Sequence, residues 1–241
     1  MQKILAVLGL GLIMSRVAWT AEIAERAETC SSIHFFLARG TGEAYPGKVA
    51  DIANGACAQL GGTCDYEDII YPAYTNDTTG FCMSIEAGVQ NGTKQLTDYA
   101  ERCPDSKLIL GGYSQGGQLV TDVLGGAGGF LWGNCEQSSS PELNYASVGS
   151  HVAAVYLFGD ARHTADQPYN YLNGSASNSS VPRTLPMLNA LDQYANKIRS
   201  YCGETDPVCA NGTDIQTHLT YFDYYTSDAI SWVVSTIKGG A

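Results

Sequence analysis

The arrangement in this sequence most able to do chemistry is a serine inside a Gly-x-Ser-x-Gly pentapeptide. Residues 112–116 read Gly-Tyr-Ser-Gln-Gly, after an apolar run at 107–110 and before a helical pattern at 115–124. A serine between a strand and a helix occupies a strained turn, and the flanking chains pass so closely that both glycines are needed. This turn would expose the Ser114 hydroxyl, and the helix N-terminus behind it would favour a developing oxyanion. The pattern predicts that Ser114 is the nucleophile of an acyl transfer.

A serine nucleophile needs a base, and the chain has only four histidines. His34 lies inside an apolar run, which favours a packed core residue, and His151 begins another such run. His163 follows the end of that run and is the main alternative base. His218 comes last, after every predicted strand. Hydrolases with a strand–turn–helix serine carry their residues in the order serine, acid, histidine, so we expect His218 to be the base.

Asp206 is the predicted acid, because it precedes His218 by twelve residues and lies between Cys202 and Cys209. If these two cysteines pair, the closed loop restricts the backbone that holds the carboxylate. The carboxylate could then orient the imidazole and stabilise the imidazolium formed during the reaction. Asp214 is closer to His218 in sequence, but it precedes an apparent helical turn, which indicates a helix cap.

The elements that would position these residues alternate between strands and helices. The predicted strands are 32–38, 67–71, 107–111, 152–158 and 197–201, and the predicted helices are 47–60, 84–102, 115–124 and 226–238. Such alternation indicates an α/β fold with a parallel sheet covered by helices on both faces. The sequence has no internal repeat and no evident domain boundary.

Eight cysteines and the first 20 residues indicate an exported protein. Residues 1–20 resemble a signal peptide, with Lys3 before an apolar run too short to span a bilayer. An even number of cysteines in an exported chain suggests four disulfides, and the short spacings favour Cys57 with Cys64 and Cys202 with Cys209. No zinc-ligand spacing occurs, so we expect no metal.

Composition argues against a nucleic-acid partner and against a membrane anchor. The formal net charge is −11, and lysines and arginines form no cluster. No segment after residue 20 is long and apolar enough to be transmembrane. Five Asn-x-Ser/Thr sequons, which are possible glycan acceptors, begin at the following positions: Asn76, Asn91, Asn173, Asn178 and Asn211.

Three motifs resemble the cutinase and acetylxylan esterase family. They are the Ala-Arg-Gly-Thr sequence at 38–41, the pentapeptide at 112–116, and Ser-Tyr-Cys at 200–202 followed by Asp-Pro-Val-Cys, Asn-Gly and His218. The resemblance covers residues 29–238. It implies a lidless three-layer α/β/α sandwich with a central five-stranded parallel sheet.

The resemblance also implies roles for individual residues. Ser114, Asp206 and His218 would form the catalytic triad. The backbone N–H of Gln115, together with Thr41, would form the oxyanion hole. By the same resemblance Cys30 pairs with Cys103 and Cys202 with Cys209, which leaves Cys82 and Cys135 for each other. No cofactor is implied.

The resemblance leaves two substrate classes and one non-catalytic alternative. The Asp-Pro-x-Cys sequence at 206–209 and the twelve-residue step to His218 are closer to acetylxylan esterases, whereas Leu219 and Tyr221 are closer to cutinases. We expect a secreted, monomeric serine esterase that removes acetyl groups from a polysaccharide such as xylan. A cutinase acting on aliphatic polyester is the alternative, and a secreted binding protein on an esterase scaffold is a third.

Overall fold

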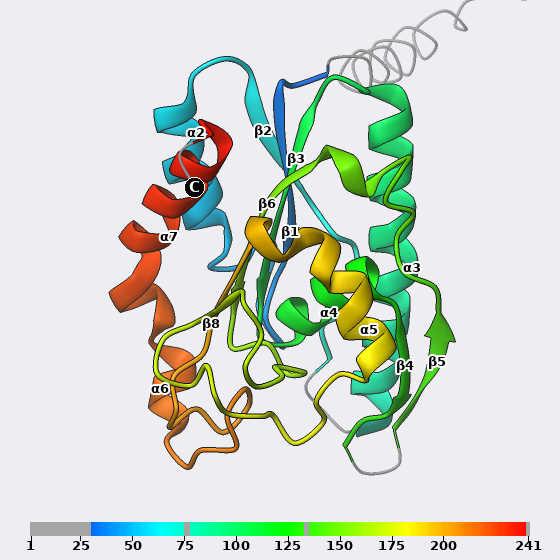
Figure 1. Cartoon of the computed structure of the whole chain (residues 1–241), viewed down its shortest axis with the longest axis vertical. Coiled ribbons are helices and arrows are strands. Elements are labelled where there is room, and N and C mark those ends of the chain that lie inside the picture. Colours follow the sequence, from blue (N-terminus) through cyan, green and yellow to red (C-terminus); the bar gives the residue numbers. More distant parts are fainter. Residues whose placement is uncertain (1–29, 75–77, 133–134, 240–241) are drawn as a thin grey trace, which may run out of the picture. The chain divides into compact units, whose positions relative to one another are not determined.

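The computed structural model describes residues 30–74, 78–132 and 135–239. The predicted signal peptide therefore lies outside the described residues. A parallel sheet runs through the part that begins at residue 31, with helices on both of its faces (Figure 1). The α/β class predicted from the alternation is confirmed.

The main sheet contains six parallel strands in the order β2-β1-β3-β6-β8-β7. Their bounds are β1 (Ile33–Ala38), β2 (Cys64–Asp68), β3 (Lys107–Tyr113), β6 (Val152–Phe158), β7 (Asn170–Tyr171) and β8 (Ile198–Tyr201). The predicted count of five was one too low, because β7 is an edge strand of only two residues. The second strand also begins and ends three residues earlier than predicted, since Cys64–Asp68 is the segment that pairs with β1.

The main helices cover the two faces of this sheet, and several of the loops between elements are long (Figure 1). Their bounds are α2 (Ala50–Leu60), α3 (Thr78–Arg102), α4 (Gln115–Gly125), α5 (Leu185–Leu191), α6 (Ile215–Leu219) and α7 (Tyr221–Ile237). Two 3-10 helices, η1 (Gly149–His151) and η2 (Asp192–Lys197), lead into β6 and β8.

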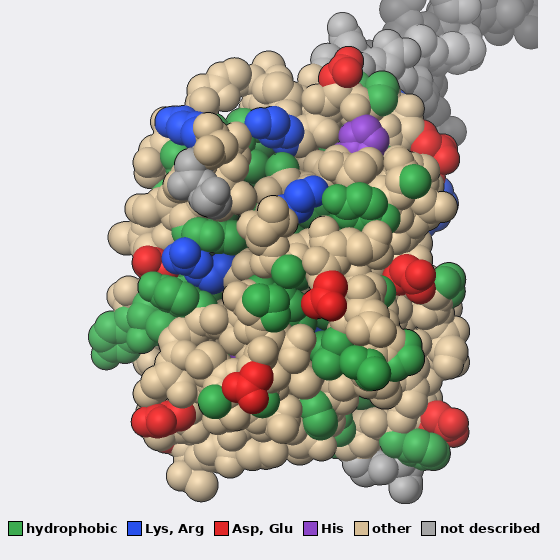
Figure 2. Space-filling model, in the orientation of Figure 1, with side chains coloured by type: hydrophobic (Ala, Val, Ile, Leu, Met, Phe, Trp, Pro, Cys, Tyr) green, Lys and Arg blue, Asp and Glu red, His purple; other side chains and the backbone are tan. Residues whose placement is uncertain are grey.

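Strand side chains alternate between two cores, as the period of a strand requires. On β1, Phe36 packs with α3 and α4, whereas Phe35 and Leu37 pack with α2 and α7. β3 repeats the alternation, with Leu110 on the first side and Ile109 on the second. Burial on both faces explains why these strands read as continuous apolar runs. On the face in Figure 2, hydrophobic side chains appear as separate groups among polar ones.

A small antiparallel hairpin lies apart from the main sheet. It consists of β4 (Ala127–Phe130) and β5 (Glu136–Ser140). The Cys82–Cys135 disulfide connects it to α3, and the Gln137 amide donates to Asp122 Oδ2 on α4 at 3.0 Å. The hairpin is therefore fastened to the α3–α4 side of the domain.

Candidate active site

Ser114 occupies the sharp turn between β3 and α4. Its backbone has φ 55° and ψ −117°, in a region that residues with side chains rarely adopt. Its N–H donates to the Phe158 carbonyl at the end of β6, at 2.8 Å. A Cβ on Gly112 would lie 2.5 Å from the Gly116 carbonyl oxygen, so the second glycine of the turn passes directly over the first. The crossing of these chains explains the glycines of the pentapeptide.

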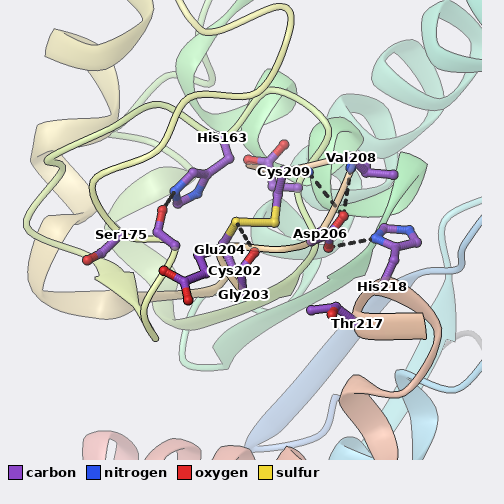
Figure 3. The surroundings of a disulfide bond; sticks show 12 residues. His163, Ser175, Cys202, Gly203, Glu204, Asp206, Val208, Cys209, Thr217 and His218 are labelled. Atoms are coloured by element: carbon purple, nitrogen blue, oxygen red, sulfur yellow. Dashed lines mark hydrogen bonds and ion pairs between the residues drawn. A yellow bond between two sulfur atoms is a disulfide. The ribbon is translucent and has the colours of Figure 1, made fainter. Parts of the chain in front are cut away.

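The structure brings Ser114, His218 and Asp206 into one hydrogen-bonded chain. Ser114 Oγ lies 2.9 Å from His218 Nε2, and His218 Nδ1 lies 2.9 Å from Asp206 Oδ2. Figure 3 shows Asp206 directed at the imidazole from the loop closed by the Cys202–Cys209 disulfide. With Nδ1 donating to the carboxylate, Nε2 is free to accept the serine proton. This is the relationship that a nucleophile, its base and an orienting acid require.

Asp206 is buried and accepts several hydrogen bonds. Its Oδ1 accepts the backbone N–H of Val208 at 2.6 Å and of Cys209 at 3.3 Å, and its Oδ2 accepts the Tyr221 hydroxyl at 2.7 Å. Burial alone would raise the pKa of the Asp206 carboxyl. The hydrogen bond and charge of His218, with the bonds from Tyr221 and Val208, outweigh it and hold that pKa below its usual range. The carboxylate therefore stays ionised although it is buried.

Two residues that sequence reasoning did not single out pack against the His218 ring. Gly159 follows β6 with φ 57°, and a Cβ there would lie 2.6 Å from His218 Cε1. Tyr113 stacks on the imidazole with ring centroids 5.2 Å apart, and its hydroxyl donates to the His218 carbonyl at 3.1 Å. These contacts confine both the ring and the backbone of His218.

Tyr221 was noted in the sequence only as a cutinase-like residue, and its contact with the catalytic acid was missed. Its hydroxyl accepts the Gly203 N–H at 2.9 Å while donating to Asp206. The Gly203 contact fastens the same disulfide loop from the helix side. The available signal was its position three residues after His218, at the start of the last helix.

Of the two residues predicted for the oxyanion hole, one directly follows the nucleophile and the other lies in a loop after the neighbouring strand. Gln115 is the first residue of α4, immediately after Ser114, and its buried side chain accepts the Ser84 hydroxyl at 2.9 Å. Thr41 lies half-buried in the loop that follows β1, the strand next to β3. The next residue, Gly42, donates its N–H to the Ala73 carbonyl at 2.9 Å. The Thr41 loop is thus anchored at the same sheet edge as Ser114.

The other histidines lie outside this arrangement. His163 is buried, its Nε2 lies 3.3 Å from the Gly174 carbonyl oxygen, and burial lowers its pKa. His34 stacks on Tyr99 and its Nδ1 lies 2.7 Å from Asp65. His151 is the last residue of η1. None of the three contacts Ser114.

Three disulfides have defined partners in the described residues: Cys57–Cys64, Cys82–Cys135 and Cys202–Cys209, with Cα separations of 5.4, 5.5 and 6.0 Å. Cys30 and Cys103 are also disulfide-bonded. Within the described ranges, no group of three or more His, Cys, Asp or Glu side chains is arranged to hold a metal ion. In the same ranges, no helix is long and apolar enough to cross a membrane.

A parallel sheet that carries a serine on a strand–helix turn, with its acid and histidine following in chain order, defines the α/β-hydrolase class. The chain belongs to the cutinase family, whose family model matches residues 29–237. It is accordingly a carboxylic-ester hydrolase.

Both branches of the family are represented among its relatives. An acetylxylan esterase of Hypocrea jecorina is 30% identical over 88% of this chain and 69% of the relative. Cutinase 11 of Verticillium dahliae is 30% identical over 92% of this chain and 74% of the relative. The solved catalytic core of the acetyl xylan esterase from Trichoderma reesei superposes with a TM-score of 0.72. It is 29% identical and covers 86% of this chain and 100% of that one.

Proposed function

We propose that this protein is an exported serine esterase that removes acetyl groups from a plant cell-wall polysaccharide such as xylan. The observation that carries hydrolysis is the continuous chain of two 2.9 Å contacts from Ser114 through His218 to Asp206. The acetyl preference rests on relatives named acetylxylan esterase and on the groups beside the nucleophile.

In the proposed reaction, Ser114 Oγ attacks the ester carbonyl carbon while His218 Nε2 accepts the hydroxyl proton. The resulting oxyanion would be held by the backbone N–H of Gln115 and by Thr41. Collapse of this intermediate breaks the bond to the sugar oxygen, which receives from His218 the proton that came from Ser114. Water, deprotonated by the same nitrogen, then attacks the acyl-serine. Acetate leaves and Ser114 regains its proton.

Polar groups next to the nucleophile support a short acyl substrate. The Gln115 side chain is buried and bonded to Ser84, whose oxygen also lies 3.4 Å from the backbone nitrogen of Tyr74. Both side chains are fully buried, so they fill the space next to Ser114 and leave no open channel there for a long alkyl chain, whose buried methylenes would each contribute about 0.8 kcal/mol.

A cutinase activity is the second candidate, because two apolar side chains are exposed near the site. Leu219, next to His218, is 44% exposed, and Met83, next to Ser84, is 55% exposed. Side chains of this kind could contact the aliphatic chain of a polyester. The relative named Cutinase 11 also favours this reading.

A series of p-nitrophenyl esters from acetyl to octanoyl, run with acetylated xylan and cutin, separates the two candidates. For an acetyl esterase, kcat/KM should fall steeply beyond acetyl or propionyl, and acetylated xylan should release acetate. A kcat/KM that rises with chain length, with no acetate released, would instead identify a cutinase.

The Ser114→Ala variant tests the triad itself. It should fold normally and lose about 10⁴-fold or more of kcat, because nucleophile and base act together. Ser231→Ala on the exposed face of α7 is the matched control and should be fully active. Failure of the wild-type protein to react with a fluorophosphonate probe would favour a non-catalytic binding protein.

Export and a monomeric state complete the proposal. Residues 1–20 would direct secretion and be removed, and the disulfides fit an oxidising compartment. N-terminal sequencing of the protein from culture medium would locate the cleavage site. Light scattering during gel filtration should give the mass of one chain.

A further inference from the structure

An open pocket beside the Asp206 loop takes no part in the proposed reaction. Its volume is about 250 Å³, and its wall includes Asn173, Thr205, Thr217 and Tyr224. The Thr205 and Thr217 hydroxyls lie 2.7 Å apart, and Tyr224 is 75% exposed. An exposed aromatic ring next to hydroxyl groups suits a sugar, which has an apolar face and a polar edge.

Asn173 is both a wall residue of this pocket and the first residue of a sequon. The sequence Asn173-Gly174-Ser175 matches the acceptor for an N-linked glycan. The Asn173 Oδ1 accepts the backbone N–H of Glu204 at 3.1 Å, which orients the carboxamide. The nitrogen that a glycan would take, Nδ2, is the other end of that group.

The other described sequons differ from Asn173 in position and in bonding. Asn91 donates its Nδ2 to the Ile70 carbonyl at 2.7 Å, and Asn211 donates its Nδ2 to the Asn178 carbonyl at 3.2 Å. Asn178 accepts a backbone N–H through its Oδ1, as Asn173 does, but it is not part of the pocket wall. Asn173 alone among these four combines the free amide end with the pocket.

The turn that presents Asn173 is tied to the loop of the catalytic acid. Leu172 has φ 76°, a left-handed conformation that its neighbours must hold in place. The Gly174 N–H donates to the Cys202 carbonyl at 2.9 Å, and the Cys202 N–H donates to the Tyr171 carbonyl at 3.0 Å. A group fixed in the pocket would therefore brace the start of the disulfide loop.

We propose that Asn173 carries an N-linked glycan whose first N-acetylglucosamine occupies this pocket. The ring stacks on Tyr224, and its polar edge faces the hydroxyls of Thr205 and Thr217. The donor is the lipid diphosphate oligosaccharide of the secretory pathway. The Nδ2–C1 bond forms as the C1–oxygen bond to diphosphate breaks, and Nδ2 loses one proton. The inference rests on the proposed export.

Endoglycosidases test the position of the sugar. The full chain is produced in yeast behind the host's own secretion leader, so that a failure of its native leader does not affect the result. Glycopeptide mapping should find Asn173 occupied. Endoglycosidase H, which leaves one N-acetylglucosamine, should leave Tm unchanged. Peptide N-glycosidase F, which removes that sugar, should lower Tm by about 2–4 °C.

Three variants make the test specific. Tyr224→Ala and Asn173→Gln should each abolish the difference between the two enzyme treatments, because one lacks the stacking ring and the other the sugar. Tyr66→Ala, a change at another exposed tyrosine, should keep the difference. An unmodified Asn173 peptide would overturn the proposal, and so would a Tm difference that survives in either of the first two variants.

Discussion

The Tyr221 hydroxyl links the catalytic acid Asp206 to the loop that carries it. The Tyr221→Phe substitution removes this hydroxyl and leaves the ring in place. This oxygen donates to Asp206 at 2.7 Å and accepts the Gly203 N–H at 2.9 Å. A hydrogen bond to a charged group contributes roughly 1.5–3 kcal/mol, and the Gly203 donor would be left unpaired. We expect the free energy of unfolding to fall by about 2–4 kcal/mol, which lowers Tm by about 5–15 °C.

The effect of Tyr221→Phe on turnover should be much smaller. Both 2.9 Å contacts from Ser114 to His218 and from His218 to Asp206 remain in this variant. Only one of the bonds that orient the carboxylate is lost, so kcat for p-nitrophenyl acetate should fall about 3- to 10-fold. Tyr224→Phe, an exposed tyrosine of the same helix, should change neither quantity.

The difference in unfolding free energy between wild type and Tyr221→Phe should depend on pH. Because the folded pKa of Asp206 is depressed, ionised Asp206 stabilises the fold above its unfolded pKa of about 3.9. This stability is lost as the pH falls through the folded pKa. Tyr221→Phe raises that pKa, so its deficit against wild type should shrink below about pH 4. Equal unfolding free energies at pH 7, or a 10³-fold loss of kcat, would refute this account of the hydroxyl.

Three further substitutions probe the surroundings of the triad. Gly159→Ala should reduce kcat about 100-fold, because the new Cβ would displace the His218 ring and small misplacements are costly; stopped-flow acylation rates check this. His163→Ala should lower Tm but change kcat less than about 3-fold, and a collapse of activity would make it the base. Replacing Cys202 and Cys209 together by alanine opens an eight-residue loop worth about 2.5 kcal/mol. Tm should fall by about 5–10 °C, and the fold-loss of kcat should be larger than in His163→Ala.

Much of this architecture follows from patterns that buried parallel strands impose. β1, β3 and β6 are buried on both faces, so their apolar runs marked them to within one or two residues. The predicted second strand was displaced because Ile69 is fully buried without belonging to a strand. A hydrophobic run indicates which residues are buried. The bounds of the strand depend instead on which residues pair through their backbone with β1.

The β4–β5 hairpin and the residues that position the triad were harder to predict from the sequence. The strands of the hairpin read Ala-Gly-Gly-Phe and Glu-Gln-Ser-Ser-Ser, with no apolar alternation. The hairpin depends on contacts with α3 and α4 that only the folded chain supplies. Tyr221 and Gly159 act by holding their neighbours in position, and such contacts could not be predicted from the sequence, although Tyr221 is one of the residues that resemble cutinases. The serine, acid and histidine could be predicted because turn chemistry and chain order constrain them.

The strand order also fixes when this protein can first turn over a substrate. The Ser114 N–H bonds to the end of β6, and the Gly159 N–H bonds to the Tyr201 carbonyl at the end of β8, at 2.9 Å. The turn that holds the nucleophile and the glycine next to the imidazole therefore depend on strands from distant parts of the chain. Such non-local pairings form late, because loop closure must precede them. During refolding, recovery of esterase activity should therefore report when β3, β6 and β8 have paired.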